Sequence, residues 1–138
     1  MAVFATESDV RLKFQLNDTT LVPSALVTAS IEDAHAELLR FLDPAFNTAS
    51  PDAALVMGET LLAGAHLFRS LASKDAFDQK AVAVGTQRIE AGQRFGALMA
   101  MASLTEQNAW YILEPYVLAR PSLAPAGVTE TTPVLGEE

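Results

Sequence analysis

Apolar side chains recur every three or four residues along most of this chain, the spacing that places them on one face of an α-helix. The longest regular stripe contains Val27, Ile31, Ala34, Leu38 and Phe41. It predicts a helix from about Pro23 to Leu42, since proline suits a first helical turn. Asp43-Pro44 ends this helix because a residue that precedes proline disfavours the α conformation.

A second long helix is expected after Ser50, which is a good N-cap and is followed by proline. It extends to about Ser73. The residues of its stripe are mostly small: Ala54, Gly58, Leu61, Ala65, Phe68 and Ala72. Small side chains allow another helix to approach closely along that stripe. Glu59 and His66 fall outside it, and we expect both on the wetter side of the helix.

Shorter helices are predicted at both ends of the chain. The first runs from Glu7 to Leu16, with Thr6 and Asp9 spaced as in a capping box. Another covers Gln93–Ala102. A final helix, capped by a serine or threonine, runs to the Glu114-Pro115 pair.

The segment Lys80–Gly92 breaks this helical pattern. Val82 and Val84 alternate with alanines, a glycine follows at Gly85, and a second mixed run contains Arg88 and Ile89. Alternation around a glycine is typical of a β-hairpin or an extended arm. A lone two-stranded ribbon is marginal in water and leaves edge groups unpaired. We therefore expect a neighbouring copy or another protein to cover it.

The predicted fold class is mainly α: a small bundle of four to five helices, with a projecting β-hairpin or extended arm between the third and fourth helices. Residues 1–118 form the helical domain, with the arm at 80–92. Residues 119–138 are rich in Pro, Gly, Thr and Glu without periodicity and predict a flexible tail.

Composition narrows the class of protein. With 138 residues, 50% hydrophobic and 19% charged, the chain fits one globular domain. The absence of cysteine excludes disulfides and thiolate chemistry. No apolar run is long enough to span a membrane and no signal peptide precedes the domain, so we expect a protein made in a cytoplasm. The net charge of −8 argues against general nucleic-acid binding.

Candidate chemistry is sparse. Glu32 and His35 have the spacing of a helical dinuclear metal motif, but that motif needs a second copy on a facing helix. The only other histidine, His66, has Ala63 at the required position. Both histidines lie on predicted polar faces, where exposure is the simpler interpretation. Nucleophile-elbow and phosphate-loop motifs are absent from the sequence, so we expect no catalytic residue, no metal and no cofactor.

The aromatic residues Trp110, Tyr111 and Tyr116 lie within seven residues of one another. Two interpretations stay open. Trp110 anchors the core with the tyrosines at its rim, or the group belongs to a protein interface, where Trp and Tyr are enriched.

Four short motifs, in this order and spacing, resemble one family. They are TESDVRLKF at Thr6–Phe14, IEDAHAELLR at Ile31–Arg40, VGTQRI at Val84–Ile89 and ILEPY at Ile112–Tyr116. The layout is similar to that of the head–tail connector proteins (adaptor or head-completion proteins) of long-tailed bacteriophages. Thr86 stands where Asp or Ser is commoner in that family, so no role is carried over for its side chain.

The resemblance implies a structural virion protein of the neck that is made in the bacterial host. It would form a dodecameric homo-oligomeric ring beneath the portal and extend the DNA channel. Its partners would be the portal protein and the next neck or tail-completion protein, while DNA passes through without specific binding. The expected intersubunit or partner contacts lie in the arm: Val82, Val84, Gly85, Thr86, Arg88 and Ile89.

Two other classes remain as alternatives. One is a small bacterial helical regulator or binding module that acts on a protein partner, for which an extended arm has no purpose. The other is a helical-bundle metalloenzyme, which elemental analysis of the purified protein tests directly.

Overall fold

The computed structural model describes the backbone of residues 3–78 and 85–118, and the side chains of these residues outside 77–92. Four α-helices make up most of it: α1 (Glu7–Phe14), α2 (Ser24–Leu39), α3 (Ala53–Asp78) and α4 (Gly85–Leu113). Two short 3-10 helices, η1 (Pro44–Phe46) and η2 (Glu114–Tyr116), follow α2 and α4. The described ranges contain one isolated antiparallel bridge, between Leu42 and Val117, and no strand. The mainly helical class is thus confirmed.

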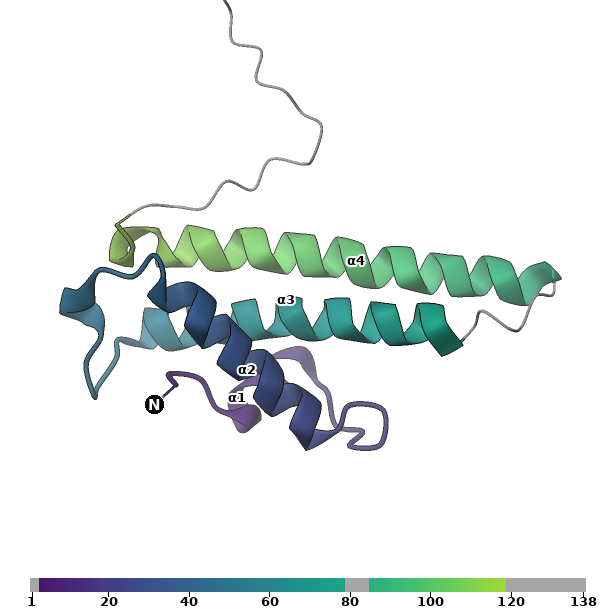
Figure 1. Cartoon of the computed structure of the whole chain (residues 1–138), viewed down its shortest axis with the longest axis horizontal. Helices are drawn as coiled ribbons and strands as arrows, with labels where there is room; N and C mark the ends of the chain where they lie inside the picture. The colour runs from purple at the N-terminus through teal and green to yellow at the C-terminus, as the bar shows by residue number, and fades with distance from the viewer. Residues whose placement is uncertain (1–2, 79–84, 119–138) are drawn as a thin grey trace, which may run out of the picture.

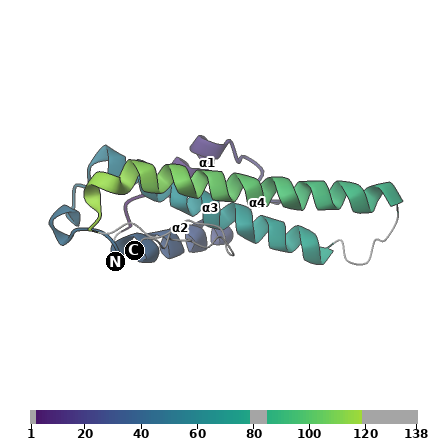
Figure 2. The same ribbon diagram turned by 90° about the horizontal axis from the view of Figure 1, so that it is seen from above.

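The third helix is the centre of the fold. It packs against each of the other three α-helices, and α4 runs back along it as the second arm of a long helical hairpin (Figure 1). Both α1 and α2 lie on the side of α3 away from α4 (Figure 1) and contact each other, and the view from above separates them across the width of the hairpin (Figure 2). The two shorter helices cover only part of the length of α3.

Small residues on α3 explain how closely its neighbours approach. A Cβ atom added to Gly58 would overlap the side chain of Leu113, at the end of α4. At Gly64 it would overlap the ring of Phe14, at the end of α1. The predicted small-residue stripe thus accounts for the approach of α4 at Gly58, while a glycine outside that stripe admits α1.

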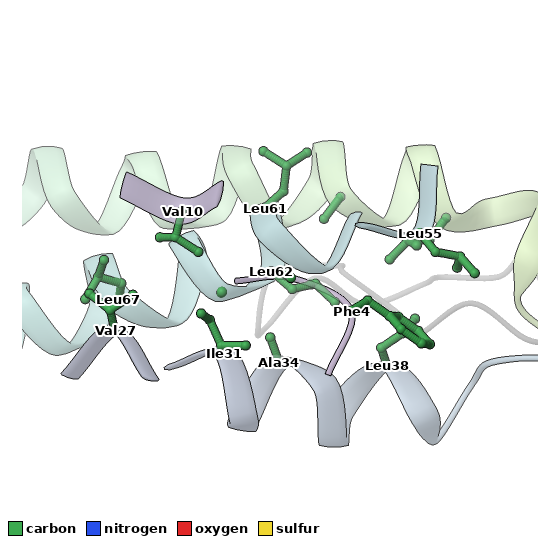
Figure 3. Close-up of a cluster of buried hydrophobic side chains, with 14 of the residues drawn as sticks. Phe4, Val10, Val27, Ile31, Ala34, Leu38, Leu55, Leu61, Leu62 and Leu67 are labelled. Carbon is green, nitrogen blue, oxygen red and sulfur yellow. The ribbon is translucent and has the colours of Figure 1, made fainter. Parts of the chain in front are cut away.

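The core lies between α2 and α3 and extends to the end of α4. Figure 3 shows side chains of α2 and α3 directed toward one another, with Phe4 and Val10 beside them. The largest fully buried apolar side chains are Trp110, Leu38, Leu55, Leu62, Leu67 and Leu113. The predicted stripe of the second helix supplies its half of this core, since Val27, Ile31 and Leu38 are buried.

The N-terminal helix forms as its local signals predict. The Thr6 side chain accepts a hydrogen bond from the Asp9 amide, and the Asp9 carboxylate accepts one from the Thr6 amide, which completes a capping box. The helix ends at Gln15, which adopts a left-handed conformation with φ of 58°. Phe14 then packs edge-to-face on Phe68 of α3, with ring centroids 5.1 Å apart.

The main correction concerns the predicted arm at residues 80–92. Residues 85–92 form about the first two turns of α4, and the two helices expected after them are one continuous helix to Leu113. Gly85 was interpreted as a break between two extended runs, but a helical glycine costs only about 1 kcal/mol relative to alanine. A single glycine therefore does not exclude a helix here. Residues 80–84 of the predicted arm lie outside the described residues.

Candidate protein interface

A carboxylate is buried at the centre of the molecule. Glu59 of α3 is completely inaccessible to solvent, and one of its oxygens lies 2.6 Å from Nδ1 of His35 on α2. The other oxygen accepts the backbone N–H groups of Phe4 (2.7 Å) and Ala5 (2.8 Å). Both carboxyl oxygens of Glu59 thus have hydrogen-bond partners, as burial of a polar group requires.

This network connects three segments that are far apart in sequence. It ties the N-terminal segment and α2 to the middle of α3, and the ring of Phe4 packs edge-to-face on His35 at 4.9 Å. The expectation that His35 and Glu59 lie on exposed faces was wrong. A signal was present, because Glu59 is the only Asp, Glu, Lys or Arg between residues 53 and 68. A single carboxyl group in an otherwise uncharged run either lies in the core with hydrogen-bond partners or lies outside the core.

The network is suited to holding the fold rather than to binding a metal. His35 is buried whereas Glu32 is exposed, so the two residues of the i, i+3 motif do not converge. Within the described residues, no three or more His, Cys, Asp or Glu side chains are grouped so that they could hold a metal ion.

The second histidine makes a similar but more exposed contact. His66 Nε2 of α3 lies 2.9 Å from a carboxylate oxygen of Glu37 on α2. This hydrogen bond is the main reason why the pKa of His66 is raised above its ordinary value, and burial opposes the shift. His66 is therefore a second link between α2 and α3, and one that depends on pH.

The residues expected to make contacts in the arm divide into two groups. Gly85, Thr86, Arg88 and Ile89 lie on helical backbone at the start of α4, and the structure describes only that backbone. Val82 and Val84 lie outside the described residues. The structure therefore brings four of these positions to the start of one helix.

The three C-terminal aromatic residues have different environments. Trp110 is fully buried and packs edge-to-face on Phe41 at 5.4 Å, which makes it a core residue. Tyr116 packs on Phe46 at 4.9 Å, and desolvation together with Asp52 raises its pKa. Tyr111 is 72% exposed and is the member of the group that a partner can reach.

Tyr111 belongs to a larger exposed surface, which we name the outward face of α4. Eight residues on the side of the helix away from α3 make up this face: Gln93, Ala97, Ala100, Met101, Leu104, Gln107, Asn108 and Tyr111. All eight are exposed, including the large apolar side chains of Met101 (49%) and Leu104 (59%). None of the eight is charged, and Arg94, which is exposed at the edge of this face seven residues before Met101, is paired with Asp75 of α3. Depletion of charge is characteristic of the core of a protein interface.

A second apolar surface lies between α1 and α3. It is a groove of about 620 Å³ in which Leu12, 75% exposed, and Met57, 38% exposed, face solvent beside Val56. Asp9 and Lys13 stand on its α1 side. The groove and the outward face of α4 belong to different helices, so the protein exposes two separate apolar surfaces.

None of the helices within the described ranges is long and apolar enough to cross a membrane. Comparison of the chain with protein-family models, with curated proteins and with solved structures found no match.

Proposed function

We propose that this chain is a structural assembly protein without catalytic activity, and that its assembly is the ring that joins a bacteriophage portal to the tail. The four motifs that resemble the connector family support this identity. Two of them fall on elements that organise the fold, because Ile31, Ala34 and Leu38 are buried in α2 and Ile112–Tyr116 spans the end of α4 and η2.

The observation that carries the proposal is the length of the α3–α4 hairpin. One end of it extends beyond α1 and α2, so that part of α4 packs on α3 alone (Figure 1). Phe95 belongs to the first half of α4, seven residues from Ala102 and thus on the same side of the helix. Ala102 is fully buried whereas Phe95 remains 38% exposed. A projecting hairpin with incompletely covered apolar residues is suited to contact with another subunit.

The proposed contacts are those of the predicted arm, moved onto the end of this hairpin. Gly85, Thr86, Arg88 and Ile89 would meet a neighbour from the first turns of α4, with Val82 and Val84 from the connection before it. An extended or hairpin conformation of residues 80–84 remains part of the proposal. The portal and the next neck or tail-completion protein would be the partners above and below the ring.

In such a ring the protein acts mechanically. Acidic side chains along the channel would repel packaged DNA and let it slide rather than bind, which is consistent with the net charge of −8. The protein would then reside in the neck of the virion.

The test is assembly on a portal. The purified chain is mixed with a purified phage portal protein, and the products are measured by native mass spectrometry and negative-stain electron microscopy. We expect a ring of twelve copies of the 14.7 kDa chain on the portal. A portal that remains bare at an excess of the chain would contradict the proposal.

A matched pair of variants localises the ring contact. Replacing both Val82 and Val84 with serine should weaken the ring, whereas the same change at Ala81 and Ala83 should not. Equal behaviour of the two variants would remove the arm from the proposal while leaving ring formation itself intact.

The alternative is a helical binding module that acts on a protein partner. The groove between α1 and α3 favours it, because an amphipathic helix is a typical ligand of such a surface. Binding to a partner other than the portal, with Leu12→Glu as the variant that abolishes it, would support this alternative.

A further inference from the structure

The middle of α4 has an unusual composition for a helix at the edge of a fold. From Phe95 to Thr105 it has no charged residue. Apolar side chains lie both on the side toward α3, with Leu98 and Met99 half-buried, and on the opposite side, with Met101 and Leu104 exposed. A helix that is apolar all round is typical of a buried position.

This surface is long, and residues 3–78 and 85–118 leave it uncovered. The outward face of α4 spans residues 93–111, which is about 28 Å at 1.5 Å per residue. No described residue packs over Met101, Leu104 or Tyr111 to bury them, since each is between 49% and 72% exposed. In a chain with a net charge of −8, a strip of this length without a carboxylate requires an explanation.

We propose that the outward face of α4 binds the same face of a second copy, with the two helices antiparallel and centred on Leu104. Residues at equal distances from the centre then lie at the same level along the pair. Leu104 meets its own counterpart, and Ala97 lies at the level of Tyr111 of the second copy. A small residue beside a large one at each end is the self-complementarity that a two-fold interface requires.

Charge also favours a second copy on this face. Two chains of net charge −8 repel each other, and the repulsion is strongest where carboxylates are brought together. The outward face of α4 brings none together, because its eight residues are all uncharged. Two copies can therefore approach here without a like-charge pair in the contact.

The face is small for a protein interface. A strip of about 28 Å along one helix of about 10 Å diameter is smaller than the ~800 Å² per partner of a standard interface. We therefore expect a weak, transient association. A two-fold contact closes with two copies, whereas a ring needs head-to-tail contacts, so this dimer is independent of the proposed ring.

Disulfide trapping tests the register of the two helices. The chain has no natural cysteine that could form a competing disulfide. Leu104→Cys should give a covalent dimer under mild oxidation, since its two thiols face each other at the centre. Ala97→Cys alone should not, because its two positions are about 21 Å apart along the pair, beyond disulfide reach. A mixture of Ala97→Cys and Tyr111→Cys chains should give the mixed dimer selectively.

Sedimentation velocity of the full chain between about 5 and 500 µM tests the association itself. The wild type should shift from monomer to dimer, and Leu104→Glu should remain monomeric with an unchanged circular dichroism spectrum and melting temperature. Leu12→Glu is the matched control, because it makes the same change at a more exposed leucine in the groove and should still dimerise.

Three outcomes would overturn the inference: a wild type that stays monomeric up to 500 µM, equal trapping of the 97–97 and 104–104 pairs, or loss of the dimer in Leu12→Glu rather than Leu104→Glu. The ring experiment is separate, because it scores binding to a portal. A bare portal with an intact dimer would count against the proposed function alone.

Discussion

Ionisable side chains are usually exposed and large apolar side chains are usually buried. The surroundings of Glu59 and the outward face of α4 depart from this rule in opposite ways. Around Glu59 a carboxyl group is buried, and each of its oxygens has a hydrogen-bond partner within the chain. On α4, large apolar side chains are exposed, and the described part of the chain does not cover them. The first region is complete within one protomer and holds the fold, whereas the described residues leave the second uncovered, and we propose that another protomer covers it.

The contrast between these two regions would fail most clearly if Glu59 were dispensable for the stability of the fold. Glu59→Ala leaves the buried His35 ring and two backbone N–H groups without their acceptor, and breaking a buried pair in this way costs about 3–5 kcal/mol. We expect a loss of that size in the free energy of unfolding, measured by urea denaturation. The control is Glu37→Ala, which removes the partly exposed partner of His66 and should cost less than about 1 kcal/mol. Similar losses in the two variants would mean that the Glu59 network does not hold the fold.

Two leucines of α4 sharpen the contrast between its two sides. Leu113 is fully buried against Gly58, so Leu113→Ala should reduce the free energy of unfolding by about 2–5 kcal/mol. Leu104→Ala changes an exposed residue and should alter it by less than about 0.5 kcal/mol. Both are measured by denaturation at a concentration well below the one at which the wild type begins to associate. A large effect of Leu104→Ala under these conditions would place Leu104 in the core of the protomer.

The close approach of α1 to α3 gives a smaller effect. Gly64→Ala adds a methyl group where the ring of Phe14 lies, and overpacking of this kind costs about 1–3 kcal/mol. The matched control is Gly96→Ala, at a helical glycine with no atom within 4 Å of the added Cβ, which should be neutral or slightly stabilising. Thermal unfolding of the two variants measures the difference, and equal melting temperatures would argue against a tight contact at Gly64.

The smallest effect is the pH dependence of the His66–Glu37 link. Because the pKa of His66 is raised in the folded protein, the link contributes its full stability below the unfolded value of 6.5. That contribution is lost as pH increases through the higher pKa of the folded state. NMR titration of the imidazole should show the raised pKa, and Glu37→Gln should return it toward 6.5. A pKa that does not respond to Glu37→Gln would mean that another group causes the shift.

The sequence predicted the helical elements where periodicity and local signals agree. The stripe of α2, the capping box of α1 and the small-residue surface of α3 all occur as expected, because each depends on residues a few positions apart. The start of α4 was interpreted differently, since alternating Val and Ala residues beside a glycine satisfy a strand pattern. At residues 85–92 the helix forms instead, as the first turns of one long helix that continues to Leu113.

The functional residues were less accessible to sequence reasoning. Whether His35, Glu59 and Trp110 are buried depends on which helix covers which face. Helical spacing along the sequence does not determine this. The uncharged run Phe95–Thr105 is visible in the sequence, but a core helix would show the same run. The exposure of Met101, Leu104 and Tyr111 is what shows that the described residues leave one side of this part of α4 uncovered.

The amino-acid sequence by itself determined that this protein is mainly helical, since period, caps and prolines act within one or two turns. Tertiary structure alone decided that Glu59 would be buried and partnered while Leu104 would be exposed. Both outcomes depend on contacts between segments that are tens of residues apart, such as Phe4 with Glu59. The hydrophobic effect rewards burial of apolar surface without specifying which surface, and that choice is made only when α1, α2 and α4 assemble around α3.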